Sequence, residues 1–245
     1  MLCEKGMKGT GMRISFDLDD TLVNDRENHK EAFKYILKFL KIDYTEELFQ
    51  QWLEFDTFYW KDYFKTITVP AEYSKTGSDS SEYLRGLRFQ LFFKTELDPF
   101  EMQKHFKEGL KIGIVPLEGA VEALKTLSKD YNIYISTNGD SFVAKEKINR
   151  IGLSNYINGI FSADLTNPPK SKSDLDYYQQ LLTFIGNTKK EEYLMTGNSY
   201  HDDVIMPNKA GIKTCWLHDK KEDNIICDYQ ISNLMELINI LKELN

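Results

Sequence analysis

The chain of 245 residues is 41% hydrophobic, which is enough for one sizeable domain or for a core domain that carries an insertion. Its net charge of -7 and pI near 5.3 exclude the broad cationic surface that a nucleic-acid polymer or an anionic membrane would require. A small anionic substrate is compatible with this charge, provided that a local cationic pocket receives it.

The cysteines Cys3, Cys215 and Cys227 lack paired or metal-ligand spacing, which indicates a reducing, cytoplasmic location. No apolar run of about 18 residues predicts a membrane span, and residues 1–11 lack the apolar centre of a signal peptide. We expect residues 1–11 to form a disordered tail or to mark an upstream start before Met12.

Strand and helix patterns alternate along most of the chain. Short apolar segments predict strands over residues 13–16, 133–136, 159–162, 193–196 and 213–217. Helix-like stretches bracket them; for example, Val121, Leu124 and Leu127 recur at the spacing of one helical face. This alternation predicts an α/β fold, a doubly wound Rossmann-like parallel sheet.

The first two strands are separated by a stretch far longer than an ordinary crossover connection. Its pattern predicts helices over residues 27–42, 45–66, 80–95 and 99–112, and a loop over residues 69–79. We therefore expect a core domain of residues 12–24 and 113–245, with an inserted all-helical domain at residues 25–112.

The second predicted helix of the insertion is crowded with aromatic side chains. They are Phe49, Trp52, Phe55, Phe58, Tyr59, Trp60, Tyr63 and Phe64. An aromatic stripe at helical spacing is typical of a core, and the alternative is that some of these rings line a substrate pocket.

Two carboxylates, Asp17 and Asp19, directly follow the first predicted strand. At positions i and i+2 they point to the same side, at the strand end where ligands bind in open α/β sheets. One carboxylate can attack phosphorus, while the other protonates the leaving oxygen and then deprotonates water. With Asp20 beside them, burial of three carboxylates would require a hard cation, for which Mg²⁺ is the default.

The segment Asp17-Leu18-Asp19-Asp20-Thr21-Leu22 resembles the first motif of the haloacid dehalogenase superfamily in its phosphatase form. The resemblance implies that Asp17 is the nucleophile and Asp19 the general acid and base. It also implies that Thr21 lies at the substrate.

Segment 135–139 resembles the second motif of this superfamily. The resemblance implies that the Thr137 hydroxyl and the neighbouring residues Asn138 and Gly139 hold the transferring phosphoryl group through oriented donors.

The third motif of the superfamily is a lysine that opens a helix, about six residues before an aromatic residue. Lys172 stands at this spacing from Tyr178, and Lys170 is the alternative because it follows two prolines. The ammonium would offset the charges of the nucleophile and of the phosphoryl oxygens.

The fourth motif corresponds to segment 195–204, where Asn198 replaces the usual first acidic residue. The resemblance implies a Mg²⁺ site formed by Asp17, the main-chain carbonyl of Asp19, Asn198 and Asp203, which orders metal-bound waters. Asp202 is a substitute for Asp203. We expect weaker metal binding, because an amide oxygen carries no negative charge.

Residues 25–112 resemble, by position and helical character, the cap that closes over the site and selects the substrate in this superfamily. Segments 85–89 and 211–217 further resemble the pyrimidine 5'-nucleotidase branch. In that interpretation Arg88 contacts the phosphate or the base of the substrate; the alternative is a solvated helix face.

These features predict a Mg²⁺-dependent phosphomonoesterase that acts through an aspartyl phosphate on a small phosphorylated metabolite, with nucleoside monophosphates as the leading substrates. The alternatives are a catalytically weak binding or regulatory protein, a sugar phosphomutase and a haloacid dehalogenase. We expect neither a nucleic-acid polymer nor a membrane as partner, and both a monomer and a homodimer remain open.

Overall fold

A computed structural model describes residues 11–74, 77–168, 170–186, 189 and 192–243. The chain divides into two compact units, of which unit 1 runs up to Asp25 and resumes at Ile114, and unit 2 is Arg26–Gly113. Both boundaries lie one residue beyond those expected from the sequence. The tail expected at residues 1–11 lies, apart from Gly11, outside the described residues.

Unit 1 contains a six-stranded sheet in the order β3-β2-β1-β4-β5-β6, in which every pair is parallel. The strands are β1 (Arg13–Phe16), β2 (Asn132–Thr137), β3 (Gly159–Ser162), β4 (Tyr193–Gly197), β5 (Lys213–Leu217) and β6 (Tyr229–Ile231). The predicted doubly wound α/β fold is confirmed. Five strands match their predicted ranges to within one residue at either end, and β6 was not predicted.

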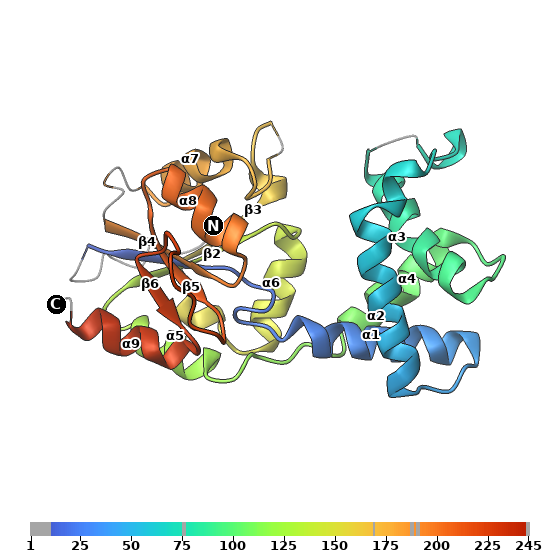
Figure 1. Ribbon diagram of the computed structural model, residues 1–245, viewed down its shortest axis with the longest axis horizontal. Coiled ribbons are helices and arrows are strands. Elements are labelled where there is room, and N and C mark those ends of the chain that lie inside the picture. Colours follow the sequence, from blue (N-terminus) through green and yellow to red (C-terminus); the bar gives the residue numbers. More distant parts are fainter. Residues whose placement is uncertain (1–10, 75–76, 169, 187–188, 190–191, 244–245) are drawn as a thin grey trace. The chain divides into compact units, whose positions relative to one another are not determined.

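Helices cover both faces of this sheet (Figure 1). They are α5 (Ala120–Leu127), α6 (Ser141–Arg150), α7 (Leu175–Phe184), α8 (Met206–Lys209) and α9 (Leu234–Glu243), with a π-helical segment, Tyr200–Ile205, before α8. Alternation along the strands divides the core: in β4, Leu194 belongs to the cluster with α5, α6 and α9, whereas Tyr193 and Met195 pack with α7 and α8.

The central strand β1 pairs with β2 and β4 along its two edges, and its two faces are buried under the helices that cover the sheet. Ile14 and Phe16 are fully buried in one cluster, and each contributes roughly 1.5–3 kcal/mol through removal of its side chain from water. Because strand order changes direction at β1, its carboxyl end is the topological switch point at which ligands bind in such sheets.

Unit 2 consists of helices α1 (Asp25–Leu40, whose first residue belongs to unit 1), α2 (Glu46–Lys61), α3 (Gly77–Phe93) and α4 (Pro99–Leu110). The hydroxyl of Thr45 caps α2, and Asp98 caps α4 ahead of Pro99. Gly86 permits close packing of α3 on α4, since a Cβ atom there would lie 1.7 Å from the Pro99 carbonyl oxygen.

The predicted helix at residues 45–66 is wrong at its end, because the backbone turns at Asp62 (φ -132°) and continues as a short 3-10 helix, Tyr63–Thr66. Some of its aromatic side chains are core residues, and others are exposed or line a cavity. Phe49, Trp52 and Tyr59 are fully buried, whereas Phe58 is exposed and Trp60 lines a cavity.

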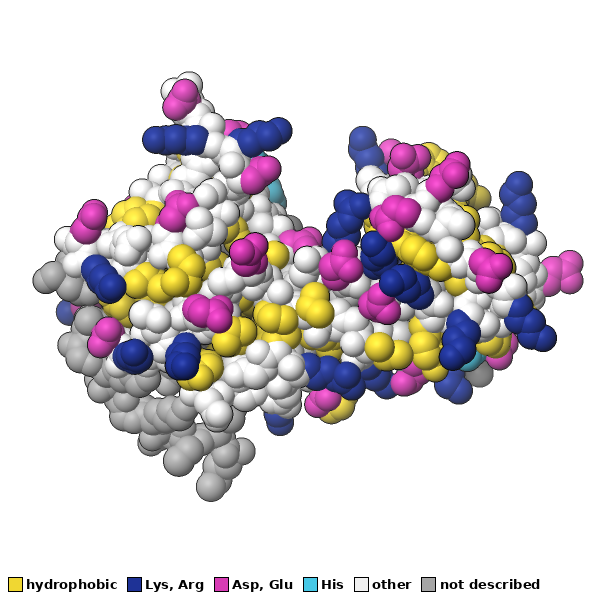
Figure 2. All heavy atoms as spheres, turned by 90° about the horizontal axis from the view of Figure 1, so that it is seen from below, with side chains coloured by type: hydrophobic (Ala, Val, Ile, Leu, Met, Phe, Trp, Pro, Cys, Tyr) yellow, Lys and Arg dark blue, Asp and Glu magenta, His cyan; other side chains and the backbone are white. Residues whose placement is uncertain are grey.

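Acidic and basic side chains are interspersed with small hydrophobic areas on the face shown in Figure 2. Within the described part of the chain, no helix is both long and apolar enough to cross a membrane.

Candidate active site

The loop after β1 holds the two predicted catalytic aspartates in different environments. Asp17 is 8% exposed, and its main-chain N–H donates to the Thr196 carbonyl of β4 at 2.8 Å. The side chain of Asp19 is 40% exposed. The buried group is thus fixed by the sheet, and the more accessible one can exchange protons with a ligand or with water.

The expectation of three buried carboxylates is wrong for Asp20. It is exposed, has a left-handed backbone (φ 56°), and accepts a hydrogen bond from the Asp25 N–H at 3.1 Å. Asp20 therefore holds the start of α1, and the charge that requires compensation in the interior is smaller than the sequence indicated.

Lys172 lies in the loop before α7 and is 2% exposed. Its ammonium is 2.5 Å from Asp17 Oδ1 and 2.6 Å from Asp203 Oδ1, and it is 3.4 Å from the Ser136 carbonyl oxygen. Its main-chain N–H donates to Asn138 Oδ1 at 2.7 Å. One lysine thus joins three loops at the carboxyl ends of β1, β2 and β4.

Burial and charge act in opposite directions on this cluster. Burial raises the pKa of Asp17 to about 7, although attraction to Lys172 opposes that change. Burial also disfavours the ammonium of Lys172, but the charges of Asp17 and Asp203 outweigh it and raise the pKa of Lys172. Two carboxylates around one ammonium leave an excess of negative charge, which favours a further cation.

The last residue of β2, Thr137, and the loop that follows it, with Asn138 and Gly139, lie beside this cluster. Thr137 is 2% exposed, and its Oγ1 accepts a hydrogen bond from the Gly139 N–H at 3.0 Å. The Thr137 carbonyl accepts from the Tyr177 hydroxyl of α7 at 3.2 Å. The loop therefore has a fixed turn geometry before any ligand binds, as a phosphoryl site requires.

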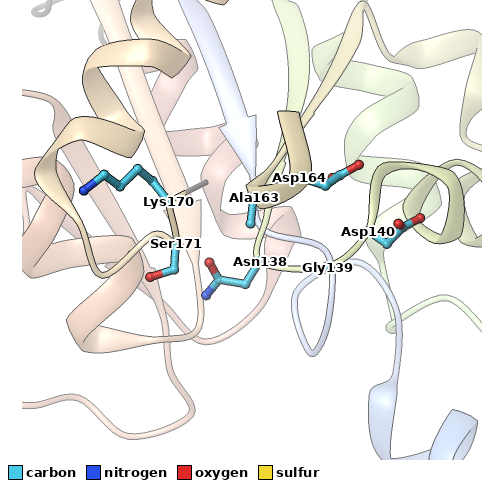
Figure 3. Close-up of a pocket in the computed structure, with 7 residues that line it drawn as sticks. All are labelled: Asn138, Gly139, Asp140, Ala163, Asp164, Lys170 and Ser171. Atoms are coloured by element: carbon cyan, nitrogen blue, oxygen red, sulfur yellow. The ribbon is translucent and has the colours of Figure 1, made fainter. Parts of the chain in front are cut away.

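Asn138 and Gly139 line an adjacent cavity of about 410 Å³, together with Asp140, Ala163, Asp164, Lys170 and Ser171 (Figure 3). The Lys170 side chain extends away from Asn138 in this view, and its ammonium lies 3.7 Å from Asp176 and 3.9 Å from Asp174. The geometry therefore favours Lys172 over Lys170 as the lysine of the site.

Asn198 and Thr21 lie close to Asp17. Thr21 Oγ1 is 3.3 Å from Asp17 Oδ2 and also 3.3 Å from Asn198 Oδ1. The main-chain oxygen of Asn198 accepts from the Trp216 indole N–H at 2.9 Å, which fixes this residue at the end of β4. Two side-chain oxygens are thus gathered around one hydroxyl.

Asp203 is fully buried and uses both of its oxygens within the protein. Oδ1 contacts Lys172, and Oδ2 accepts from the Ser199 N–H at 2.9 Å. A Cβ atom at Gly197 would lie 2.2 Å from Asp203 Oδ2, so glycine is needed there. Through these contacts Asp203 holds the loop after β4 in place next to Lys172.

Asp202, considered only as a substitute for Asp203, connects two loops. Its Oδ2 accepts from Asn138 Nδ2 at 3.0 Å and its Oδ1 from the Ser173 hydroxyl at 2.7 Å. Burial alone would raise the pKa of Asp202, but hydrogen bonds from His201 and Ser173 lower it overall. Asp202 thus holds the loops of Asn138 and Lys172 together.

Lys147 is a residue of the site that the sequence did not indicate. It lies on α6, is 7% exposed, and places its ammonium 2.5 Å from Asp19 Oδ1 and 3.4 Å from Asp25 Oδ1. Burial opposes its charge, but Asp19 and Asp25 outweigh burial and raise the pKa of Lys147. Lys147 therefore fixes the side chain of Asp19 and joins it to the start of α1.

Arg88 lies on α3 of unit 2, where it is 6% exposed and pairs with Asp56 at 2.6 Å. The alternative of a solvated helix face is therefore wrong for Arg88, whose guanidinium lies next to the rings of Trp52 and Phe89. The partner of Arg88 in the structure, Asp56, also belongs to unit 2.

The residues around Asp17 fit a Mg²⁺ ion. Among the described residues, no group of three or more His, Cys, Asp and Glu side chains forms a metal-binding cluster. The predicted set instead offers the buried carboxylate of Asp17, one amide oxygen and one main-chain carbonyl, whereas both oxygens of its fourth member, Asp203, are used within the protein. Mg²⁺ in proteins is commonly held by one or two carboxylates together with waters and phosphate. The excess negative charge around Lys172 suits that ion.

A doubly wound sheet with an aspartate, a threonine and a lysine gathered at its switch point defines a class of α/β hydrolases. A sequence model of the haloacid dehalogenase-like hydrolases matches residues 14–217, and the chain belongs to this family.

Relatives of known name cover nearly the whole chain. The pyrimidine 5'-nucleotidase YjjG of Escherichia coli is 26% identical, over 93% of this chain and 96% of its own. The glyceraldehyde 3-phosphate phosphatase of Pyrococcus furiosus is 26% identical, over 95% and 93%. The magnesium-bound HAD-hydrolase YfnB of Bacillus subtilis is a structural neighbour with TM-score 0.78 and 23% identity, covering 94% and 98%. The predicted family is confirmed.

Proposed function

We propose that this chain is a Mg²⁺-dependent phosphomonoesterase that hydrolyses nucleoside monophosphates through a phosphorylated Asp17. The observation that carries the proposal is the buried Asp17 carboxylate, whose Oδ1 is 2.5 Å from the Lys172 ammonium while its Oδ2 lies beside the Thr21 hydroxyl. One oxygen is held by the lysine, and the other faces the polar loops.

In the first step Asp17 Oδ2 attacks phosphorus, and the bond from phosphorus to the leaving oxygen breaks. Asp19 transfers its proton to that oxygen, so the alcohol leaves uncharged. In the second step Asp19 takes a proton from water, water oxygen attacks phosphorus, and the bond to Asp17 breaks. The products are inorganic phosphate and the original aspartate pair.

The loop of Thr137 to Gly139 and Lys172 would stabilise the negative charge of the transferring group. Asp17, the carbonyl of Asp19 and Asn198 would hold Mg²⁺, with Asp203 bracing the Asn198 loop. The ion would supply positive charge that favours the approach of a phosphate dianion to a carboxylate. Residues 26–113 would act as the cap that selects the substrate.

The experiment measures phosphate release from a panel of pyrimidine and purine nucleoside monophosphates, sugar phosphates and phospho-acids, with Mg²⁺ or with EDTA. We expect phosphate release that requires Mg²⁺. In Asp17→Asn the rate of release should fall roughly 10³-fold or more, because removing the nucleophile alone lowers the rate about as much as removing all the catalytic residues together. Asp20→Asn is the matched control, since Asp20 is exposed and holds α1. Equal rates for Asp17→Asn and the wild type would exclude the mechanism.

The alternatives differ in measurable ways. A dehalogenase would release halide without metal, whereas the accessible carboxylate of Asp19 suits an oxygen leaving group that needs a proton. A mutase would pass the phosphoryl group to a sugar, and a binding protein would show no turnover above Asp17→Asn. Nucleoside monophosphates are preferred because YjjG and the Streptococcus pneumoniae relative PynA carry the name pyrimidine 5'-nucleotidase.

A further inference from the structure

Trp216 supports the loop of Asn198 and has no part in the chemistry described above. The residue belongs to β5, is 5% exposed, and lies opposite Gly197, the last residue of β4. Its indole N–H donates to the main-chain oxygen of Asn198 at 2.9 Å. Because the indole N–H is the only hydrogen-bonding group of a tryptophan side chain, that group is committed to the residue that directly follows β4.

The peptide group between Asn198 and Ser199 is held at both of its polar ends. Trp216 contacts its carbonyl oxygen, and its N–H, which belongs to Ser199, donates to Asp203 Oδ2 at 2.9 Å. Asp203 is fully buried and Trp216 is nearly so. Two fixed partners on opposite ends of one planar group set its orientation, and thereby the direction in which the Asn198 side chain leaves the backbone.

Aromatic contacts hold the indole itself in place. The Tyr200 ring lies 4.7 Å from the Trp216 ring between centroids, and the His218 ring is stacked on it at 4.2 Å with an interplanar angle of 21°. The Tyr200 hydroxyl in turn accepts from the Ile226 N–H at 3.2 Å. Aromatic pairs contribute about 0.5–1.5 kcal/mol beyond the burial of their area, so the indole donor is fixed before any ion binds.

The direction of the Asn198 side chain matters because its amide has only one oxygen. A carboxylate can turn either of two equivalent oxygens to a cation, whereas an amide turned the wrong way presents N–H donors. In the structure Asn198 Oδ1 lies 3.3 Å from Thr21 Oγ1, which is itself 3.3 Å from Asp17 Oδ2. The amide oxygen is therefore on the side of the nucleophile.

We propose that Trp216 is a positioning residue of the Mg²⁺ site, which acts through the peptide group of Asn198 and keeps Asn198 Oδ1 directed toward Asp17. This inference rests on the proposed function, in which Asn198 is a ligand of the ion. Residues that orient a metal ligand typically account for about 10- to 100-fold in metal affinity. Trp216 supplies the lower part of this range, because Asp203 still holds the Ser199 N–H when the indole is lost.

Calorimetric titration of the full chain with MgCl₂ tests this inference. In Trp216→Phe, which keeps an aromatic ring and removes the N–H, the Mg²⁺ dissociation constant should rise roughly tenfold. Phosphate release from uridine 5'-monophosphate should fall at limiting Mg²⁺ and return to within a few-fold of the wild type at saturating Mg²⁺. Thr214→Val is the matched control for a general loss of stability, since it removes a buried hydroxyl from the same strand without touching Asn198.

Replacement of Trp216 by 3-benzothienylalanine gives a second variant if Trp216→Phe does not fold. Its sulfur takes the place of the N–H in a ring of nearly the same shape, and it should show the same tenfold rise. Wild-type Mg²⁺ affinity in a folded Trp216 variant would overturn the inference and leave hydrolysis through Asp17 intact. An equal rise in Thr214→Val would also overturn it, because loss of stability would then explain the effect. A wild type that binds Mg²⁺ but releases no phosphate would overturn the proposed function, while the affinities would still decide the role of Trp216.

Discussion

Lys172 in unit 1 and Arg88 in unit 2 are each more than nine-tenths buried, and the two cations have different surroundings. Lys172 in unit 1 contacts two carboxylates, Asp17 and Asp203. Arg88 in unit 2 contacts one carboxylate, Asp56, and packs among rings. The first cluster keeps an excess of negative charge and suits metal-assisted chemistry, whereas in the second cluster the charges of Arg88 and Asp56 balance each other.

Among the variants that keep the Asp17 nucleophile, replacement of Lys172 should give the largest effect on activity. In Lys172→Met the nucleophile loses its partner, and kcat/KM for phosphate release should fall roughly 10²- to 10³-fold, as expected for the loss of one charge-stabilising donor. Stability should fall too, because two buried carboxylates then repel each other.

Lys170→Met is the matched control, since Lys170 lies near surface carboxylates. It should retain activity within a few-fold. Circular dichroism of both variants checks the fold, and Lys172→Arg provides a second variant in which positive charge is kept. A larger loss in Lys170→Met than in Lys172→Met would reverse the assignment of the lysine.

Breaking the pair in unit 2 should act mainly on stability. Arg88→Met leaves Asp56, whose side chain is 18% exposed, without its partner. Removing one member of a fully buried pair costs about 3–5 kcal/mol, and we expect a smaller loss for this part-buried carboxylate. Urea unfolding followed by circular dichroism measures this cost.

The double variant Arg88→Met with Asp56→Leu should recover most of the lost stability, because it replaces both charges by apolar groups. Arg85→Met serves as control, since Arg85 is exposed on the same helix. Recovery in the double variant would show that the pair itself is dispensable for folding.

The difference between the two clusters also explains what the sequence could predict. Asp17 and Asn198 directly follow buried strands, and Thr137 is the last residue of β2. Because parallel strands bring their carboxyl ends to one edge of the sheet, position along the chain was enough to predict that these residues lie together. Asp56 and Arg88 lie on separate helices, and no strand pattern relates them. β6 was missed because three residues carry too little alternation to be detected.

Lys147 was missed for a related reason. It lies within the run of charged residues at 145–147, and its two neighbours in that run are exposed. Only the rotation of α6 against the sheet turns one of these side chains toward Asp19. A charged residue on a helix is usually solvated, and the sequence offers no signal for the exception.

Lys147→Met should give an intermediate effect that depends on the leaving group. Without Lys147 the Asp19 side chain is no longer fixed, so an alkyl phosphate, which needs a proton donor, should lose roughly 10- to 100-fold in kcat/KM, part of the gain that general acid catalysis supplies. An aryl phosphate with an acidic phenol should lose only a few-fold.

Lys145→Met is the control for this effect, because Lys145 is exposed on the same helix. Lys147→Arg should restore much of the activity by keeping a donor near Asp19. If Lys147→Met slowed alkyl and aryl phosphates equally, the role of Lys147 in positioning Asp19 would be disproved.

Asn198→Asp should tighten Mg²⁺ binding, because it adds a negative charge beside Thr21 and Asp17. We expect the dissociation constant, measured by calorimetry, to fall about tenfold, since ligand charge is a main determinant of affinity for hard cations. Thr214→Ser, on β5 and away from the ion, is the control. Unchanged affinity in Asn198→Asp would place the ion away from this residue.

The last effect concerns the pH dependence of Mg²⁺ binding at the charged cluster, which needs no substitution. Burial raises the pKa of Asp17 to about 7, and the ion binds only the carboxylate form. As the pH falls below about 7, a proton must leave before the ion can bind, so the apparent dissociation constant should rise up to tenfold per pH unit; above about pH 8 it should be constant. Calorimetry between about pH 5.5 and 8.5 measures this slope, and Asp17→Asn, which has no proton to lose, should remove it. A constant Mg²⁺ affinity across this range in the wild type would contradict the role of the Asp17 carboxylate in holding the ion.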